Sequence, residues 1–151
     1  MSEVRRINDQ LKRAFEGEAW HGPSLMEILQ GVTAAQAATK PIATAHSIWE
    51  LVLHITFWEE VSRKRAEGDP TMYRAEDGLF TVTDTSEAAW QAAIEKLKQT
   101  NAALRDTIAK LDDDKLREKA GGQEYSIYFM LHGVIQHDLY HAGQIILLKK
   151  A

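Results

Sequence analysis

Apolar residues recur every three or four positions in four long segments of this chain, a spacing that belongs to helices and not to strands. In the first segment the repeat comprises Val4, Ile7, Leu11, Ala14 and Phe15. In the third it comprises Trp90, Ile94, Leu97, Asn101, Leu104, Ile108 and Leu111, where Asn101 is interpreted as a buried polar contact that fixes helix register. No stretch alternates as a strand does, so the pattern predicts an all-α four-helix bundle.

Capping residues mark where the other long segments begin. Ser47 and Glu50 have the spacing of a capping box, in which each side chain accepts a hydrogen bond from the other residue's backbone amide. Asp84 with Glu87 forms a similar pair before the third segment, and Ser126 precedes the fourth. These residues predict three long helices that begin beside them.

Glycine and proline interrupt the helical pattern between these segments. Residues 68–83 contain few periodic apolar positions and predict a long connection. Pro23 opens a short helical piece over residues 23–30, because proline is tolerated in the first turn of a helix. The chain has 151 residues, the length of one domain, and we expect residues 1–151 to form it.

Composition narrows the class of protein. The chain has no cysteine, which excludes disulfides, thiolate metal sites and a cysteine nucleophile. Its net charge of −4 and its lack of long basic runs do not indicate nucleic-acid binding. No stretch reaches the roughly 20 apolar residues of a membrane span, and the first residues lack the apolar run of a secretion signal. We expect a cytoplasmic protein that acts on a small-molecule substrate and forms a homodimer, with no nucleic-acid or membrane partner.

Three histidines occupy positions where the helical repeat predicts core residues. In the fourth segment the repeat comprises Met130, Val134, His137, His141, Gln144 and Leu148. In the second it comprises Leu51, His54, Trp58 and Val61. A buried imidazole without a partner costs on the order of 1–3 kcal/mol, so these side chains need something to bind. A divalent cation would satisfy all three, because neutral imidazole is its commonest ligand.

The spacing of these histidines is compatible with a single metal ion. His137 and His141 lie four residues apart and therefore on one helix face. His54 would supply the third ligand from the second helix. The distances of the histidines from the ends of their helices match better if the second and fourth helices are antiparallel. That orientation requires residues 68–83 to cross over and predicts an up-down-down-up arrangement. The alternative, separate histidines with ordinary hydrogen bonds, stays open at this point.

Two polar residues beside the histidines are candidate catalytic groups. Gln144 lies one turn beyond His141 and could orient a ligand or brace that imidazole, but it could equally be a helix-packing glutamine. Glu50 lies one turn before His54 and could act as a base, although its capping-box role explains it as well. Asp138 lies about 100° off the repeat, which favours a solvated surface acid over a partner of a ligand histidine.

In its longest motifs the chain resembles the DinB/YfiT-like family of metal-dependent enzymes. The resemblance begins with SIWELVLHI at 47–55, continues with SEAAWQAAIEKL at 86–97 and ends with YFMLHGVIQHDLYHAGQIILLKK at 128–150. Its most specific part is HDLYHAGQI, an H-x-x-x-H-x-G-Q pattern. The resemblance implies a four-helix bundle whose divalent metal ion is held by His54, His137 and His141.

The resemblance also implies an activity. The family includes thiol-dependent transferases that use bacillithiol or mycothiol. We therefore expect an open three-histidine site in a metal-dependent hydrolase or thiol-dependent S-transferase, the latter with a low-molecular-weight thiol. Zinc, nickel, manganese and iron all accept nitrogen ligands, so the sequence does not select one.

Two other functions stay open. One is a non-catalytic, metal-stabilised stress or interaction protein that forms a homodimer through the apolar excess of the second helix. The other is a helical partner-binding module without a metal.

Overall fold

The computed structural model describes residues 1–151 and contains helices but no β-sheet. Its four long helices are α1 (Glu3–Glu16), α4 (Ile48–Ala66), α5 (Glu87–Ala109) and α6 (Ile127–Lys150). The connections contain the short helices α2 (Leu25–Leu29) and α3 (Ala34–Ala38) and the 3-10 turns η1 (Ala75–Gly78) and η2 (Lys115–Arg117). None of the helices combines the length and apolar character needed to cross a bilayer. The prediction of an all-helical chain with four long helices is confirmed.

Two of the predicted caps begin their helices. At the start of α4 the Ser47 hydroxyl accepts from the Glu50 amide and the Glu50 carboxylate accepts from the Ser47 amide. At the start of α6 Ser126 accepts from the Phe129 amide. Each bond satisfies a backbone donor that the first helical turn leaves without a partner.

The predicted Asp84–Glu87 cap of α5 is wrong. Ser86 is the cap, because its hydroxyl accepts from the Ala89 amide, while Asp84 only accepts from the amide of Ser86. Glu87 instead accepts from the Ala34 amide at 2.9 Å and ties α5 to α3. Helix α3 could not be predicted, since its five residues, AAQAA, are too few to establish a period.

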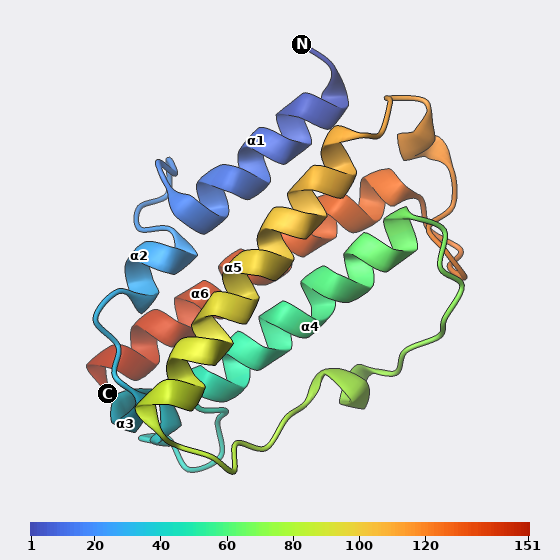
Figure 1. Ribbon diagram of the computed structural model, residues 1–151. Helices are drawn as coiled ribbons and strands as arrows, with labels where there is room; N and C mark the ends of the chain where they lie inside the picture. Colours follow the sequence, from blue (N-terminus) through green and yellow to red (C-terminus); the bar gives the residue numbers. More distant parts are fainter.

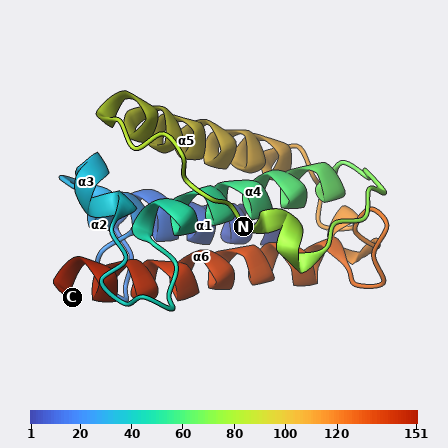
Figure 2. The ribbon, with the colours of Figure 1, turned by 90° about the horizontal axis from the view of Figure 1, so that it is seen from below.

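The chain path brings α4 and α6 together in opposite directions. In Figure 1 residues 67–86 return along the outside of the bundle from the end of α4 to the start of α5, so these two helices run the same way. Helices α1 and α6 run the opposite way. Figure 2 shows α6 lying alongside α4 over most of its length, with α5 on the far side of α4.

Two groups of buried apolar side chains fill the interior. One group of 18 residues joins the first parts of α4 and α5 to the last part of α6, and the other group of 14 residues joins their opposite ends to α1. On each of three helices a buried polar residue separates the two groups: Glu59 on α4, Asn101 on α5 and Asp138 on α6. The bundle therefore contains a polar layer between two apolar ones.

Candidate metal centre

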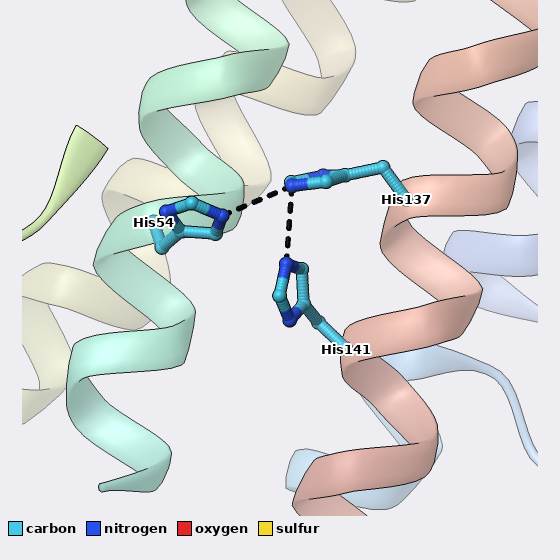
Figure 3. A group of neighbouring side chains, drawn as sticks. All are labelled: His54, His137 and His141. Atoms are coloured by element: carbon cyan, nitrogen blue, oxygen red, sulfur yellow. Dashed lines mark hydrogen bonds between the residues drawn. The ribbon is translucent and has the colours of Figure 1, made fainter. Parts of the chain in front are cut away.

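Three imidazoles from two helices meet beside this polar layer. Figure 3 shows His54 projecting from α4 toward His137 and His141 on the facing side of α6. The Nε2 atom of His137 lies 3.0 Å from Nε2 of His54 and 3.1 Å from Nε2 of His141. All three side chains are partly buried. The structure thus brings together the three histidines that the sequence predicted would meet.

Hydrogen bonds on the outer side of the cluster fix two of the three rings. Nδ1 of His54 lies 2.8 Å from the carbonyl oxygen of Gly78, and Nδ1 of His141 lies 2.6 Å from Oε1 of Gln144. A carbonyl oxygen can only accept, so both Nδ1 atoms carry the proton. The Nε2 atoms of His54 and His141 therefore present lone pairs to the common centre.

The partner of His54 comes from a turn that lies tightly against α4. A Cβ atom at Gly78 would lie 2.5 Å from Nε1 of Trp58 and 3.1 Å from Cδ1 of Phe57. Any larger residue would have to displace these rings, so glycine lets the backbone carbonyl approach His54. The sequence analysis missed this contact because a backbone acceptor carries no residue signature.

The donor set fits a metal ion. With lone pairs on Nε2 of His54 and His141, the one proton that Nε2 of His137 could carry would satisfy only one of them. Nitrogen ligands at about 2.0–2.1 Å from a divalent ion lie roughly 2.9 Å apart at right angles and roughly 3.3 Å apart in a tetrahedron. The two separations from Nε2 of His137, 3.0 and 3.1 Å, fall within that interval, and all three ligand atoms lie within 4.8 Å of one another. His54, His137 and His141 could therefore hold one metal ion, with one ligand atom each.

Burial keeps the three imidazoles uncharged. It lowers the pKa of His54 and His137 and lowers the pKa of His141 to about 4. Repulsion from neighbouring imidazolium groups lowers the pKa of His54 and His141 further. Neutral imidazole is the form that binds a metal ion, so protons do not compete for this site at neutral pH.

Glu50 lies one turn before His54, beside a cavity of about 120 Å³ that also reaches His54. Its carboxylate accepts from the Ser47 amide, pairs with Lys40 at 3.0 Å and lies 3.4 Å from His46. Burial by itself raises the pKa of Glu50, but the Ser47 hydrogen bond and the Lys40 pair outweigh it and lower that pKa. Glu50 is thus an ionised carboxylate engaged by other groups, and its catalytic role stays a prediction.

Gln144 contacts His141 directly, and replacing it by leucine is expected to lower metal affinity about 10-fold. Leucine keeps a similar volume but removes the Oε1 acceptor that holds Nδ1–H of His141. Competition with a chromogenic chelator for zinc measures the affinity. Gln136→Leu, at an exposed position of the same helix, is the control. Equal affinities in the two variants would show that Gln144 only packs between helices.

Asp138 is not the solvated surface acid that its position off the repeat favoured, because only 2% of it is exposed. The Glu59 carboxyl group faces it from α4, and Asn101 Nδ2 donates to Oε1 of Glu59 at 2.8 Å. The Oδ1 atom of Asp138 lies 3.8 Å from Nδ1 of His137, which is too long for a hydrogen bond. The buried polar layer therefore extends to the edge of the histidine cluster.

The two carboxyl groups share a proton at neutral pH. Burial raises the pKa of Asp138 to about 7, and burial together with the charge of Asp138 raises the pKa of Glu59 well above its ordinary value. Oε2 of Glu59 and both carboxyl oxygens of Asp138 have no other partner, so a shared proton satisfies them. The burial of Glu59 could have been predicted from a second helical repeat on α4, at residues 52, 55, 59, 62 and 66. All five of these residues are buried, and Glu59 is the one acid among them.

A groove of about 490 Å³ opens at the histidines and runs between α4 and α6. Its walls include Trp58, Val134 and Tyr140, and Arg65 and Tyr125 also line it. Two hollows of about 570 and 590 Å³ lie on other faces, but none of the three histidines lines either of them. The groove is thus the larger of the two spaces that reach the histidines, and a substrate could enter the site through it.

Comparison with known proteins identifies the family of the chain. Residues 19–145 match the family model described as the DinB superfamily, a range that contains all three histidines. A search of curated proteins gave no significant match. Because the family match covers well over half of its residues, the chain belongs to the DinB superfamily.

Proposed function

We propose that this chain is a metal-dependent enzyme, an up-down-down-up bundle whose single divalent ion is held by His54, His137 and His141. The observation that carries the proposal is the convergence of three Nε2 atoms, 3.0 and 3.1 Å apart in two of the pairs, at least two of them with lone pairs directed inward. Three protein ligands would leave at least one position for water or substrate, as in catalytic rather than structural sites.

Thiol S-transfer fits the site better than hydrolysis. A bound divalent ion supplies Lewis acidity, which lowers the pKa of a thiol or water at the open position. A thiol activated in this way needs no further base, whereas Glu50, the nearest candidate base, is occupied by Ser47 and Lys40. In the transfer, sulfur forms a bond to an electrophilic carbon, the leaving group departs with its bonding pair, and the thiol proton passes to solvent.

The residues of the chain would position the reactants. Gly78 and Gln144 hold two imidazoles in the ligating tautomer, and the groove between α4 and α6 would hold the electrophile. Since the chain has no cysteine, the sulfur nucleophile would be a low-molecular-weight thiol.

A homodimer without catalysis is the second candidate. Exposed apolar side chains form a stripe on α6, where Phe129, Tyr140 and Leu147 are 66%, 67% and 66% exposed. This stripe, and not α4, would be the interface, because most apolar residues of α4 are covered within the chain. In that case the metal ion would mainly stabilise the bundle.

Metal analysis followed by an activity panel tests the proposal. We expect about one zinc, nickel, manganese or iron ion per chain after purification without chelators. We expect the loaded protein to transfer bacillithiol or N-acetylcysteine to 1-chloro-2,4-dinitrobenzene. Hydrolysis of p-nitrophenyl acetate without a thiol would assign the hydrolase instead. Stoichiometric metal with no turnover, together with unfolding on metal removal, would support the non-catalytic dimer.

A further inference from the structure

The groove that opens at the histidines also contains an arginine without an acidic partner, and we propose that Arg65 binds an oxyanion of the substrate. This inference rests on the proposed function, since it names a substrate class for the same site. The substrate would be an extended small molecule that carries a carboxylate or phosphate at the end remote from the reacting group.

Arg65 differs from the other arginines of the chain in being buried and unpaired. Only 7% of it is exposed, and no carboxylate lies within ion-pair distance of its guanidinium. The arginines that do pair with a carboxylate are all more exposed: Arg6, Arg13, Arg63, Arg74, Arg105 and Arg117. A buried cation is normally paired, because removing its charge from water is costly.

The contacts of Arg65 hold its guanidinium in place but leave donors unused. Nη1 donates to the hydroxyl of Tyr125 at 2.8 Å, and the guanidinium carbon lies 6.0 Å and 5.9 Å from the ring centres of Trp58 and Tyr73. The rings and the C-terminal end of α4 offset part of the burial cost. Nε nevertheless has no partner, and a guanidinium carries five N–H groups. An oxyanion in the groove could accept two parallel hydrogen bonds from them.

The position of Arg65 relative to the histidines sets the length of the substrate. Arg65 lies eleven positions after His54, which is about three helical turns, so both residues are on one face of α4 and roughly 16 Å apart along its axis. A helical side chain leans toward the N-terminal end of its helix, which brings the guanidinium closer to the histidines. The substrate would therefore span roughly 10–16 Å.

The walls between these two ends favour an apolar middle. Trp58 and Val134 line the groove, and no atom beyond the adjoining backbone of α6 and the neighbouring residues lies within 4 Å of the position that a Cβ of Gly133 would occupy. The missing side chain at Gly133 leaves room on the α6 side. A substrate whose middle part is apolar, either flexible or aromatic, would thus bury that part in the groove between its two polar ends.

Thiols of defined length test the assignment in cobalt-loaded protein. The four probes are 11-mercaptoundecanoic acid, 11-mercapto-1-undecanol and their short counterparts 3-mercaptopropionic acid and 3-mercapto-1-propanol. Thiolate-to-cobalt absorption reports their binding. We expect the long acid to bind about tenfold more tightly than the long alcohol. The short acid, which cannot reach Arg65, should show no such advantage over 3-mercapto-1-propanol.

Variants assign the preference to the guanidinium. Arg65→Met should abolish the preference for the long acid without weakening the binding of the long alcohol. Arg65→Lys should retain part of this preference. Arg117→Met, at a remote exposed position, should keep all of it. A preference that survives in Arg65→Met overturns the proposal. If Arg65→Met does not fold, the wild-type series still decides, because equal binding of long acid and long alcohol also overturns it.

A measurement without metal separates this proposal from the proposed function. Titration calorimetry of metal-free protein with decanoate, decyl phosphate and 1-decanol should show that both anions bind through Arg65 and which of them binds more tightly. If thiols give no cobalt band but decanoate binding needs Arg65, the metal proposal fails and the oxyanion site stands. If the cobalt band forms and neither anion is preferred over the alcohol, the metal proposal stands and the oxyanion site is wrong.

Discussion

Replacing His137 by alanine is expected to lower metal affinity by at least about 100-fold, because even a group that only orients a ligand contributes 10- to 100-fold. His137 is the central member of the cluster, since its Nε2 atom contacts those of both His54 and His141. Without it, two imidazoles from different helices remain, and two ligands rarely retain a divalent ion. Competition with a chromogenic chelator, together with elemental analysis of the purified variant, measures the loss.

The same substitution should also remove the stabilisation that the metal ion gives to the fold. A ligand that binds only the folded chain stabilises it by about 4 kcal/mol at 1,000 times its dissociation constant. We expect zinc to raise the melting temperature of the wild type and to leave that of His137→Ala unchanged. His132→Ala, on the same helix but outside the cluster, is the control and should respond as the wild type does. Full metal affinity in His137→Ala, or an equal loss in His132→Ala, would contradict the three-histidine site.

The helices and the histidine cluster were predictable because both depend on periodicity. A helix of 19 to 24 residues repeats its apolar pattern often enough to be recognised, and a histidine within that pattern is conspicuous. The features missed by the sequence analysis depend on partners that are distant in the chain. The acceptor for His54 is a backbone carbonyl 24 residues away, and α3 is too short to show a period.

Buried charges were the other features that the sequence analysis missed. Arg65 stands in the run Arg63–Lys64–Arg65 and Glu59 in the pair Glu59–Glu60, where one member faces solvent and the next faces the interior. Neighbouring residues on a helix point about 100° apart, so two adjacent residues of the same type can differ in burial. Asp138 likewise lies off the histidine repeat but toward α4, where Glu59 faces it. Arg65 continues the repeat that contains His54, and Glu59 stands in the second repeat of α4, so extending these repeats across charged residues would have predicted that both are buried.

The buried pair of Glu59 and Asp138 is expected to make the wild-type chain less stable as pH rises. Burial raises the pKa of Asp138 from 3.8 to about 7 and also raises that of Glu59, whereas in the unfolded chain both groups ionise near pH 4. Between about pH 4 and pH 7 the folded chain therefore binds more protons than the unfolded chain. The free energy of unfolding then falls by about 1.4 kcal/mol per pH unit, or about 2–3 kcal/mol from pH 5 to pH 8.

Glu59→Gln should reduce this loss, because it removes the raised pKa of Glu59 itself. Its amide N–H can donate to the ionised Asp138 at every pH, while its Oε1 still accepts from Asn101. Urea unfolding of metal-free protein at pH 5, 6, 7 and 8 should show the variant gaining up to about 2–3 kcal/mol on the wild type over that range. The histidines act in the opposite direction, since their lowered pKa values reduce stability as pH falls below about 6.5, but this contribution is common to both proteins. Glu95→Gln, at an exposed position of α5, should follow the wild-type profile. Parallel profiles for wild type and Glu59→Gln would mean that the two carboxyl groups hold no shared proton.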